Sequence, residues 1–286
     1  MLRAIRAHFD ADGFIEVETP VRIPAPANEP HIIPPASGGQ FLRASPELQM
    51  KRLLALGFKK LCQIGPCFRQ GERGALHNPE FTMLEWYRAG ADYMALFADL
   101  KSFVCAAAEA VCGARAISFR GAEIDLARGW EKITVREAFK MHAGWDPIAD
   151  FDQARFDHDM ALKVEPNLPK DRPLILLDYP APAASLSRLS PSDSRVAERW
   201  EAYIGGVEIC NAFGELTDAA EQRRRFEQAR AEKLALNEPP LPLDEDFLAS
   251  LPAMPPASGA ALGIDRLALI LLDAPAISAV RAFCEP

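Results

Sequence analysis

A pair of glycines, Gly205 and Gly206, separates two short segments in which apolar and polar residues alternate. The segments are residues 200–204 (WEAYI) and 207–210 (VEIC). A two-residue glycine turn between alternating segments is typical of a β-hairpin, so we expect antiparallel strands in the C-terminal half of the chain. In a regular ladder the opposing pairs are Ile204 with Val207, Tyr203 with Glu208, and Glu201 with Cys210.

The predicted hairpin carries two acidic residues on one face. Glu201 and Glu208 become diagonal neighbours, with Cβ atoms roughly 7 Å apart or less. Such carboxylates repel unless a cation lies between them, and Mg²⁺ bound to nucleotide phosphates is a natural candidate. A solvated acidic face is the alternative. Strand alternation points Asn211 and Glu215 the other way, and a β-bulge between residues 208 and 211 is needed to bring them to the side of Glu208.

The rest of the sequence predicts an α+β fold. Helices and strands segregate rather than alternate as βαβ units, which favours a mostly antiparallel sheet flanked by helices over a doubly wound sheet. Apolar spacing, caps and glycine or proline breaks predict helices over residues 2–9, 45–56, 91–112, 135–142, 221–235 and 263–272, and strands over 14–19, 60–69, 80–87 and 174–179. The helix at 45–56 is expected to begin with Ser45 as N-cap and Pro46 at its first position.

The strand at residues 80–87 contains an unusual carboxylate. Alternation places Phe81, Met83, Glu85 and Tyr87 on one face. A carboxylate among apolar neighbours needs a partner, and a cationic ligand group would supply one. A half-buried strand that tolerates a glutamate is the alternative.

Two further segments have features of an anion-binding site. The loop 70–79 has Arg69 at one end and His77 and Asn78 at the other, and a guanidinium there is able to take phosphate oxygens. An isolated arginine at a strand end is, however, usually part of a surface ion pair. The segment 258–272 (SGAALGIDRLALILL) leads from small residues into a helix whose first turn carries Asp265 and Arg266, and a helix N-terminus favours anions.

Composition excludes several classes of protein. The 286 residues carry a formal net charge of −8, which argues against a chain that grips a nucleic-acid backbone. The six cysteines form no C-x-x-C pair and are expected to be reduced thiols. No secretory leader and no apolar run long enough to span a bilayer is present, so we expect a cytoplasmic protein with no membrane partner.

Read together, these segments resemble the three signature motifs of class II aminoacyl-tRNA synthetases in their usual order. Residues 14–20 (FIEVETP) resemble motif 1, residues 68–87 resemble motif 2, and residues 259–269 resemble motif 3. The runs SPELQMKRLL, HNPEFTMLEWY and VEICNAFGELTDAAEQRRRFE are similar to the lysyl branch. The chain begins inside motif 1, so we expect one catalytic domain over 1–286 and no N-terminal anticodon-binding OB-fold. That arrangement, with the runs WYRAGADYMALF and RVAERWEAYIGGVE, resembles the stand-alone family that ligates (R)-β-lysine to elongation factor P.

The resemblance implies a role for individual residues. Arg69 and Arg266 are expected to be catalytic, and Mg²⁺ is expected on Glu201 and Glu208. ATP is expected to contact Arg69, Gln70, Gly71, His77, Asn78, Phe81, Glu208, Ile209, Asn211, Gly263 and Arg266. The amino-acid pocket is expected to be lined by Ser45, Pro46, Glu47, Glu85, Tyr87, Glu215 and Ala261.

Four positions depart from the family pattern. Ala261 stands where lysyl synthetases have glycine, and one methyl group in a tight pocket discriminates between substrates by roughly 1–3 kcal/mol. Gly71 stands where motif 2 has a glutamate, with Glu72 next, and Leu76 stands where synthetases have an arginine. Ala212 replaces the glycine of an Asn-Gly-Phe run.

The resemblance implies a two-step, ATP-dependent ligase reaction. The amino acid is first activated as an adenylate and is then transferred to the ε-amine of a lysine on elongation factor P, with no tRNA. Motif 1 implies a homodimer. One alternative is a truncated lysyl-tRNA synthetase-like enzyme that activates L-lysine. A non-catalytic regulatory paralogue is an alternative of another class, and the presence of Arg69, Glu208 and Arg266 counts against it.

Overall fold

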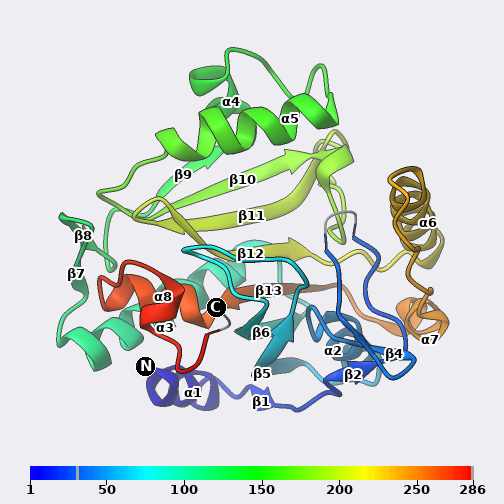
Figure 1. The fold of residues 1–286 in the computed structure, drawn as a ribbon, viewed down its shortest axis with the longest axis horizontal. Coiled ribbons are helices and arrows are strands. Elements are labelled where there is room, and N and C mark those ends of the chain that lie inside the picture. The colour runs from blue at the N-terminus through cyan, green and yellow to red at the C-terminus, as the bar shows by residue number, and fades with distance from the viewer. Residues whose placement is uncertain (30–31, 285–286) are drawn as a thin grey trace.

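The computed structural model describes residues 1–29 and 32–284, and its centre is one eight-stranded sheet (Figure 1). Its six central strands, in the spatial order β5, β6, β13, β12, β11 and β10, each pair antiparallel with their neighbours. At the two edges of the sheet, β1 runs parallel to β5 and β9 runs parallel to β10. The predicted α+β fold with a mostly antiparallel sheet is confirmed. In order across the sheet, the strands are β1 (Ile15–Glu16), β5 (Lys60–Phe68), β6 (Glu80–Ala89), β13 (Ala257–Gly263), β12 (Val207–Gly214), β11 (Val196–Ile204), β10 (Leu174–Pro180) and β9 (Glu131–Thr134).

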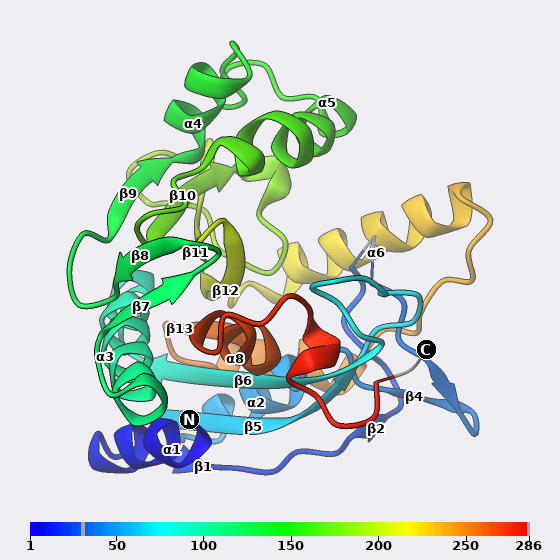
Figure 2. The ribbon, with the colours of Figure 1, turned by 60° about the vertical axis from the view of Figure 1, so that its left-hand side comes forward.

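Helices pack around this sheet (Figure 2). They are α1 (Leu2–Ala11), α2 (Glu47–Ala55), α3 (Tyr93–Cys112), α4 (Val135–His142), α5 (Gln153–Asp159), α6 (Ala219–Ala235), α7 (Glu245–Ser250) and α8 (Ile264–Leu271). Two small sheets lie beside the main one, formed by β2 (Arg22–Ile23), β3 (Ala36–Ser37) and β4 (Gln40–Leu42), and by β7 (Ala116–Phe119) and β8 (Ala122–Asp125). Within the described residues, no helix combines the length and apolarity needed to cross a membrane.

The largest core lies between the sheet and helices α1, α3 and α8. Leu84 and Trp86 of β6 are fully buried in it. Because strand residues alternate faces, their neighbours Glu85 and Tyr87 point to the opposite face, as the sequence predicted. The candidate site is therefore built on the face of the sheet that the main core does not occupy.

Most predicted elements are present, with shifted ends. The strand expected over residues 14–19 covers only Ile15–Glu16, and the helix expected from Glu221 begins at Ala219, where the Asp218 side chain caps it. Helix α2 begins at Glu47, so Pro46 is the N-cap residue and the prediction of Ser45 in that place was wrong by one position. The Ser45 hydroxyl still accepts a hydrogen bond from the Glu47 N–H at 2.9 Å.

The predicted hairpin is formed by β11 and β12, and its register differs from the regular ladder in one respect. The pairs Ile204 with Val207 and Tyr203 with Glu208 are confirmed. The pair Glu201 with Cys210 was wrong, because the register shifts and Glu201 lies opposite Asn211. The extra residue in the shift is Ile209, so the bulge that the sequence required between 208 and 211 is present. It brings Asn211 and Glu215 to the same cavity as Glu208.

The hairpin turn explains the glycine pair. Gly205 and Gly206 both have positive φ, 61° and 76°, as a type I′ turn requires. A Cβ on Gly205 would also lie 2.3 Å from the ring of Phe119, so the turn packs against β7 without room for a side chain.

Candidate active site

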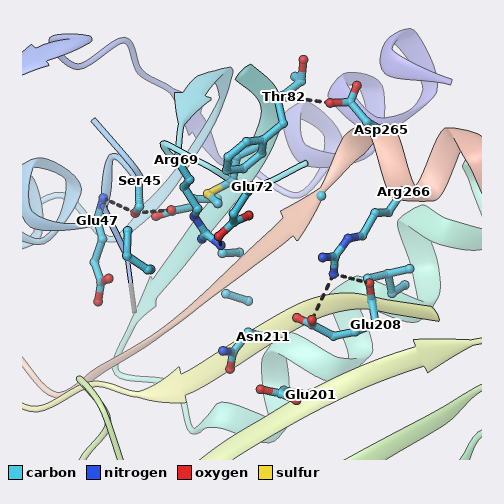
Figure 3. Close-up of a pocket in the computed structure, with 18 of the residues that line it drawn as sticks. Ser45, Glu47, Arg69, Glu72, Thr82, Glu201, Glu208, Asn211, Asp265 and Arg266 are labelled. Carbon is cyan, nitrogen blue, oxygen red and sulfur yellow. Dashed lines mark hydrogen bonds and ion pairs between the residues drawn. The ribbon is translucent and has the colours of Figure 1, made fainter. Parts of the chain in front are cut away.

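A cavity of about 350 Å³ lies on the face of the sheet formed by β6, β12 and β13 (Figure 3). Residues far apart in the sequence meet there, because the antiparallel order sets motif 2, the hairpin and motif 3 side by side. The predicted site residues that line it are Ser45, Glu47, Arg69, His77, Asn78, Phe81, Glu85, Tyr87, Glu201, Glu208, Ile209, Asn211, Glu215, Ala261, Gly263 and Arg266.

Three predicted residues do not line the cavity. Pro46 lies between two that do and is the N-cap of α2. Gln70 donates its backbone N–H to the Ile33 carbonyl at 2.7 Å. Gly71 has φ 82° in the turn of the motif 2 loop, a conformation that favours glycine over the glutamate of the family pattern.

One end of the cavity is formed by the motif 2 loop. The Arg69 guanidinium lies over the Phe81 ring, 5.2 Å from its centroid, and its Nη1 is 3.6 Å from a carboxylate oxygen of Glu72. Glu72 also lines the cavity, so the residue next to Gly71 brings a carboxylate to this loop. We refer to this end, with Arg266 and Glu208, as the phosphate end, after the ligand that the resemblance implies.

Arg266 joins the start of α8 to the hairpin and to the motif 2 loop (Figure 3). Its Nη1 donates to the Glu208 carboxylate at 3.0 Å and to the Glu208 carbonyl at 2.8 Å. Its Nη2 lies 2.7 Å from Nε2 of His77, and its Nε donates to the Leu76 carbonyl at 3.3 Å. Burial and the Arg266 charge lower the pKa of His77, which favours a neutral ring that accepts from the guanidinium. Leu76 thus contributes its backbone where the family pattern has an arginine side chain.

The two hairpin carboxylates have the donor chemistry of a magnesium site. The Glu201 carboxylate is held in place because Tyr179 and Tyr203 donate to Oε2 at 2.5 and 2.8 Å, and Arg199 donates to Oε1 at 2.6 Å. A carboxylate has about four acceptor sites, so one remains for a ligand. Burial and the nearby Glu201 charge raise the pKa of Glu208, and Arg266 opposes this. Mg²⁺ keeps several waters and is usually bound through one or two carboxylates, and both Glu201 and Glu208 line the cavity.

The other end of the cavity, which we call the amino-acid end, is centred on Glu85. Its Oε1 accepts from the Ser45 hydroxyl and its Oε2 accepts from the Tyr87 hydroxyl at 3.0 Å. Burial, with a contribution from the Glu47 charge, raises the pKa of Glu85 to about 8. Its hydrogen-bond partners are hydroxyl groups rather than a cation, so a positively charged ligand group would be stabilised there.

Lys51 neutralises two carboxylates of this end, and the sequence analysis missed it. Its side chain is fully buried, and its ammonium forms ion pairs with both Glu47 and Glu215. The two carboxylates raise the pKa of Lys51 further above its usual range, although burial opposes them. Burial raises the pKa of Glu215 to about 7, and Lys51 opposes it. The spacing of Glu47 and Lys51, four residues apart on a helix, was the feature that could have revealed the pair.

A glycine on β13 allows the amino-acid end to close. A Cβ on Gly259 would lie 2.1 Å from the Tyr87 ring and 2.4 Å from Oε1 of Glu215. Only a residue without a side chain leaves room for both groups at this point. Ala212, in contrast, is buried in the main core on the other face, so that departure from the family pattern does not touch the cavity.

Besides Glu72, three charged cavity residues were not predicted. Asp265 accepts from the Thr82 N–H at 2.8 Å and from Arg281 at 2.9 Å, which ties α8 to β6. Arg199 orients Glu201. Glu29 reaches the cavity from the loop between β2 and β3, and its hydroxyl partner Ser185 is 156 residues away, a contact that no local sequence pattern reveals.

The sheet order, the bulged hairpin and the arginine at the start of α8 define a class of protein that sequence comparison identifies. The chain belongs to the class II tRNA synthetases: the family described as tRNA synthetases class II (D, K and N) matches residues 1–286. Within it, the chain is similar to proteins named elongation factor P–(R)-β-lysine ligase. The relative from Edwardsiella ictaluri is 40% identical, covering 99% of this chain and 92% of its own, and the relative from Proteus mirabilis is 41% identical, covering 98% and 91%. A lysine–tRNA ligase from Moorella thermoacetica is 37% identical and covers 99% of this chain but 63% of its own length.

Proposed function

We propose that this protein activates (R)-β-lysine with ATP and transfers it to the ε-amine of a lysine on elongation factor P. The observation that carries the proposal is a single cavity in which buried carboxylates at one end adjoin arginines suited to phosphates at the other. The names of two relatives that match over almost their whole length give the substrate and the acceptor. We further propose that residues 1–286 form one catalytic domain that works without tRNA.

In the first step, a carboxylate oxygen of the amino acid attacks the α-phosphorus of ATP in line. A P–O bond forms to give the aminoacyl-adenylate, and the bond to pyrophosphate breaks. Arg69 would hold the α-phosphate and the attacking carboxylate, while Arg266 and His77 would bind the phosphate tail beside Gly263. Catalysis here depends on positioning and charge neutralisation rather than on a side-chain base.

Other cavity residues would complete the ATP site. Phe81 would stack on the adenine with the ring face that Arg69 does not cover, and Asn78 would contact the nucleotide. Glu201 and Glu208 would hold Mg²⁺, which when bound neutralises charge on the phosphate oxygens.

In the second step, a neutral lysine ε-amine of the acceptor attacks the adenylate carbonyl. A C–N bond forms and the amine loses a proton. The single bond between the carbonyl carbon and the phosphate oxygen breaks, and AMP leaves with that oxygen. The products are an amide on the acceptor and free AMP, so one ATP is consumed per modified lysine.

Ala261 is placed to act on substrate choice. It lies on β13 opposite Glu85 of β6 on one side and Asn211 of β12 on the other, and it lines the cavity. Its methyl group would occupy space beside the carbons of the substrate that carry the amino and carboxylate groups. We propose that this methyl favours an amino group on the β-carbon over one on the α-carbon.

A homodimer is part of the proposal. The edge of the sheet at β1 exposes large apolar side chains, with Ile15 50%, Leu56 77% and Phe58 36% exposed. Such side chains gathered at one edge mark an interaction surface, and motif 1 contributes to it. We place the reaction in the cytoplasm, where translation factors act.

A second candidate function is activation of L-lysine in the manner of a lysyl-tRNA synthetase. The 37% identity to a lysine–tRNA ligase across almost the whole chain favours it. Both functions use the same adenylation step, so the identity of the amino acid and of the acceptor separates them.

Intact-mass measurement of elongation factor P tests the proposal. The factor is incubated with the protein, ATP, Mg²⁺ and (R)-β-lysine, and in parallel with L-lysine. We expect one lysyl addition that depends on ATP, is greater with (R)-β-lysine, and is lost in Arg266→Ala. No addition with either amino acid, alongside normal AMP release with L-lysine and tRNA, would favour the second candidate.

A further inference from the structure

Contacts on both sides of Glu29 hold the described part of its segment at the cavity wall. The loop joins β2 to β3, and the buried Asn28 side chain donates from Nδ2 to the Pro242 carbonyl at 3.1 Å. Beyond it, the Ile33 carbonyl accepts from the Gln70 N–H at 2.7 Å, which ties the loop to motif 2. Glu29 itself lines the cavity and remains partly accessible.

The amino-acid end has more carboxylates than the protein neutralises. Four line it, and Lys51 forms ion pairs with two of them. The other two have hydroxyl partners. Glu85 accepts from the Ser45 and Tyr87 hydroxyls, and Glu29 accepts one hydrogen bond from Ser185 at 3.3 Å. The four carboxylates are those of Glu29, Glu47, Glu85 and Glu215.

Charged groups on both sides of Glu29 affect the pKa of its carboxyl. Burial raises the pKa of Glu29, the Glu47 charge adds to this, and the charges of Arg69 and Arg199 oppose it. Glu29 and Arg69 both line the cavity, and Gln70, the residue after Arg69, is hydrogen-bonded to Ile33 of the same segment as Glu29. The proposed mechanism assigns Arg69 to the reacting carboxylate. Glu85 is instead enclosed by Ser45 and Tyr87.

We propose that Glu29 binds the amino group that a diamino acid carries next to its reacting carboxylate, while Glu85 binds the distal amino group. This inference rests on the proposed function and adds a specificity residue to it. A diamino acid lying along the cavity would then place each ammonium group on a carboxylate that has no cation of its own. The attraction between an ammonium ion and a carboxylate is stronger at a partly buried site than in water.

The substitution Glu29→Gln removes the charge and keeps the shape of the side chain. In ATP–pyrophosphate exchange, which needs no acceptor protein, we expect the KM for (R)-β-lysine to rise about 10- to 100-fold, because one desolvated charge pair is lost. The KM for ATP should not change. Glu123→Gln is the matched control, since Glu123 is exposed on β8, lies outside motif 1 and does not line the cavity.

An analogue distinguishes direct contact from a structural role. 6-Aminohexanoic acid has the carboxylate and the distal amino group but lacks the amino group that Glu29 is proposed to bind. Its inhibition constant against exchange should be equal, within about twofold, in the wild-type protein and Glu29→Gln. Equal weakening of 6-aminohexanoic acid and (R)-β-lysine would show that Glu29 only supports the cavity wall, and would overturn the inference.

Two other outcomes have separate meanings. If Glu29→Gln exchanges pyrophosphate normally but transfers poorly to elongation factor P, Glu29 serves the acceptor lysine and the inference is overturned while the proposed function stands. If the wild-type protein exchanges with no diamino acid, the proposed function itself fails and the inference fails with it.

Discussion

The two ends of the cavity are built differently, although both lie on the same face of the sheet. At the phosphate end the side chains of Arg69, Arg266 and Glu208 are 26%, 20% and 37% exposed; Arg266 pairs with Glu208, and Arg69 pairs with Glu72. At the amino-acid end Lys51 and Glu215 are 0% and 1% exposed and form part of the buried interior. The difference teaches that charges at the phosphate end are open to a ligand and contribute little to the fold, whereas charges at the amino-acid end are buried and contribute to stability.

The largest effect on stability is expected from Lys51→Met. It leaves Glu47 and Glu215 buried beside each other without their cation, which should lower the free energy of unfolding by about 3–5 kcal/mol. Chemical denaturation measures it. The control is Arg52→Met, because the neighbouring Arg52 forms only a surface pair with Asp246 at 3.4 Å and should change stability by less than about 1 kcal/mol. Equal losses of stability from the two substitutions would contradict the claim that the buried charges at the amino-acid end stabilise the fold.

The converse result is expected from Arg69→Ala at the phosphate end. Loss of a guanidinium that stabilises the transition state should lower the exchange rate by about 10²- to 10³-fold. The free energy of unfolding should change by less than about 1 kcal/mol, because Arg69 and Glu72 form a partly exposed ion pair. Arg69→Lys, which keeps the charge but loses the planar donor fork, should recover part of the rate. A stability loss as large as that of Lys51→Met would contradict this account.

A smaller effect is expected from Ala261→Gly. Removing the methyl group should reduce the preference for (R)-β-lysine over L-lysine by roughly tenfold, the discrimination that one carbon in a tight pocket provides. The ratio of kcat/KM for the two amino acids in pyrophosphate exchange measures it. An unchanged ratio would remove Ala261 from selectivity and leave that role to other residues of the amino-acid end.

A pH dependence confined to the amino-acid end is also expected. The pKa of Glu85 is raised to about 8, so below that pH the unliganded carboxyl is mostly protonated. A cationic amino group favours the ionised form, and binding must then release a proton. The KM for the amino acid should therefore rise by up to about tenfold for each pH unit below 8, while the KM for ATP changes less. A KM for the amino acid that is flat between pH 6 and 8 would contradict this assignment.

Sequence reasoning predicted the phosphate end better than the amino-acid end. Glycine turns, strand alternation and the motif order located Arg69, Glu208 and Arg266 near one another, because local patterns determine those strands and the α8 start. The hairpin register was wrong at Glu201 and Cys210, since a bulge depends on packing as well as on the strand pattern. The sequence nevertheless named the region where a bulge was required.

The missed residues share a physical cause. Lys51 was regarded as a helix residue, and its ion pair with Glu215 joins positions 164 residues apart, 215 − 51, which only the tertiary fold brings together. Glu29 lies in a proline-rich loop with no periodic pattern, so nothing local indicated that it faces the cavity. Burial of charge is a property of the whole fold, and the sequence shows only which charges are available to be buried.

Pyrophosphate exchange by the purified wild-type protein, with ATP and either (R)-β-lysine or L-lysine, tests the central claim most directly. It requires both ends of the cavity at once and no acceptor. We predict exchange with both amino acids and a higher kcat/KM for (R)-β-lysine. Exchange with neither, from protein that is folded and binds ATP, would contradict the claim that this cavity activates a diamino acid.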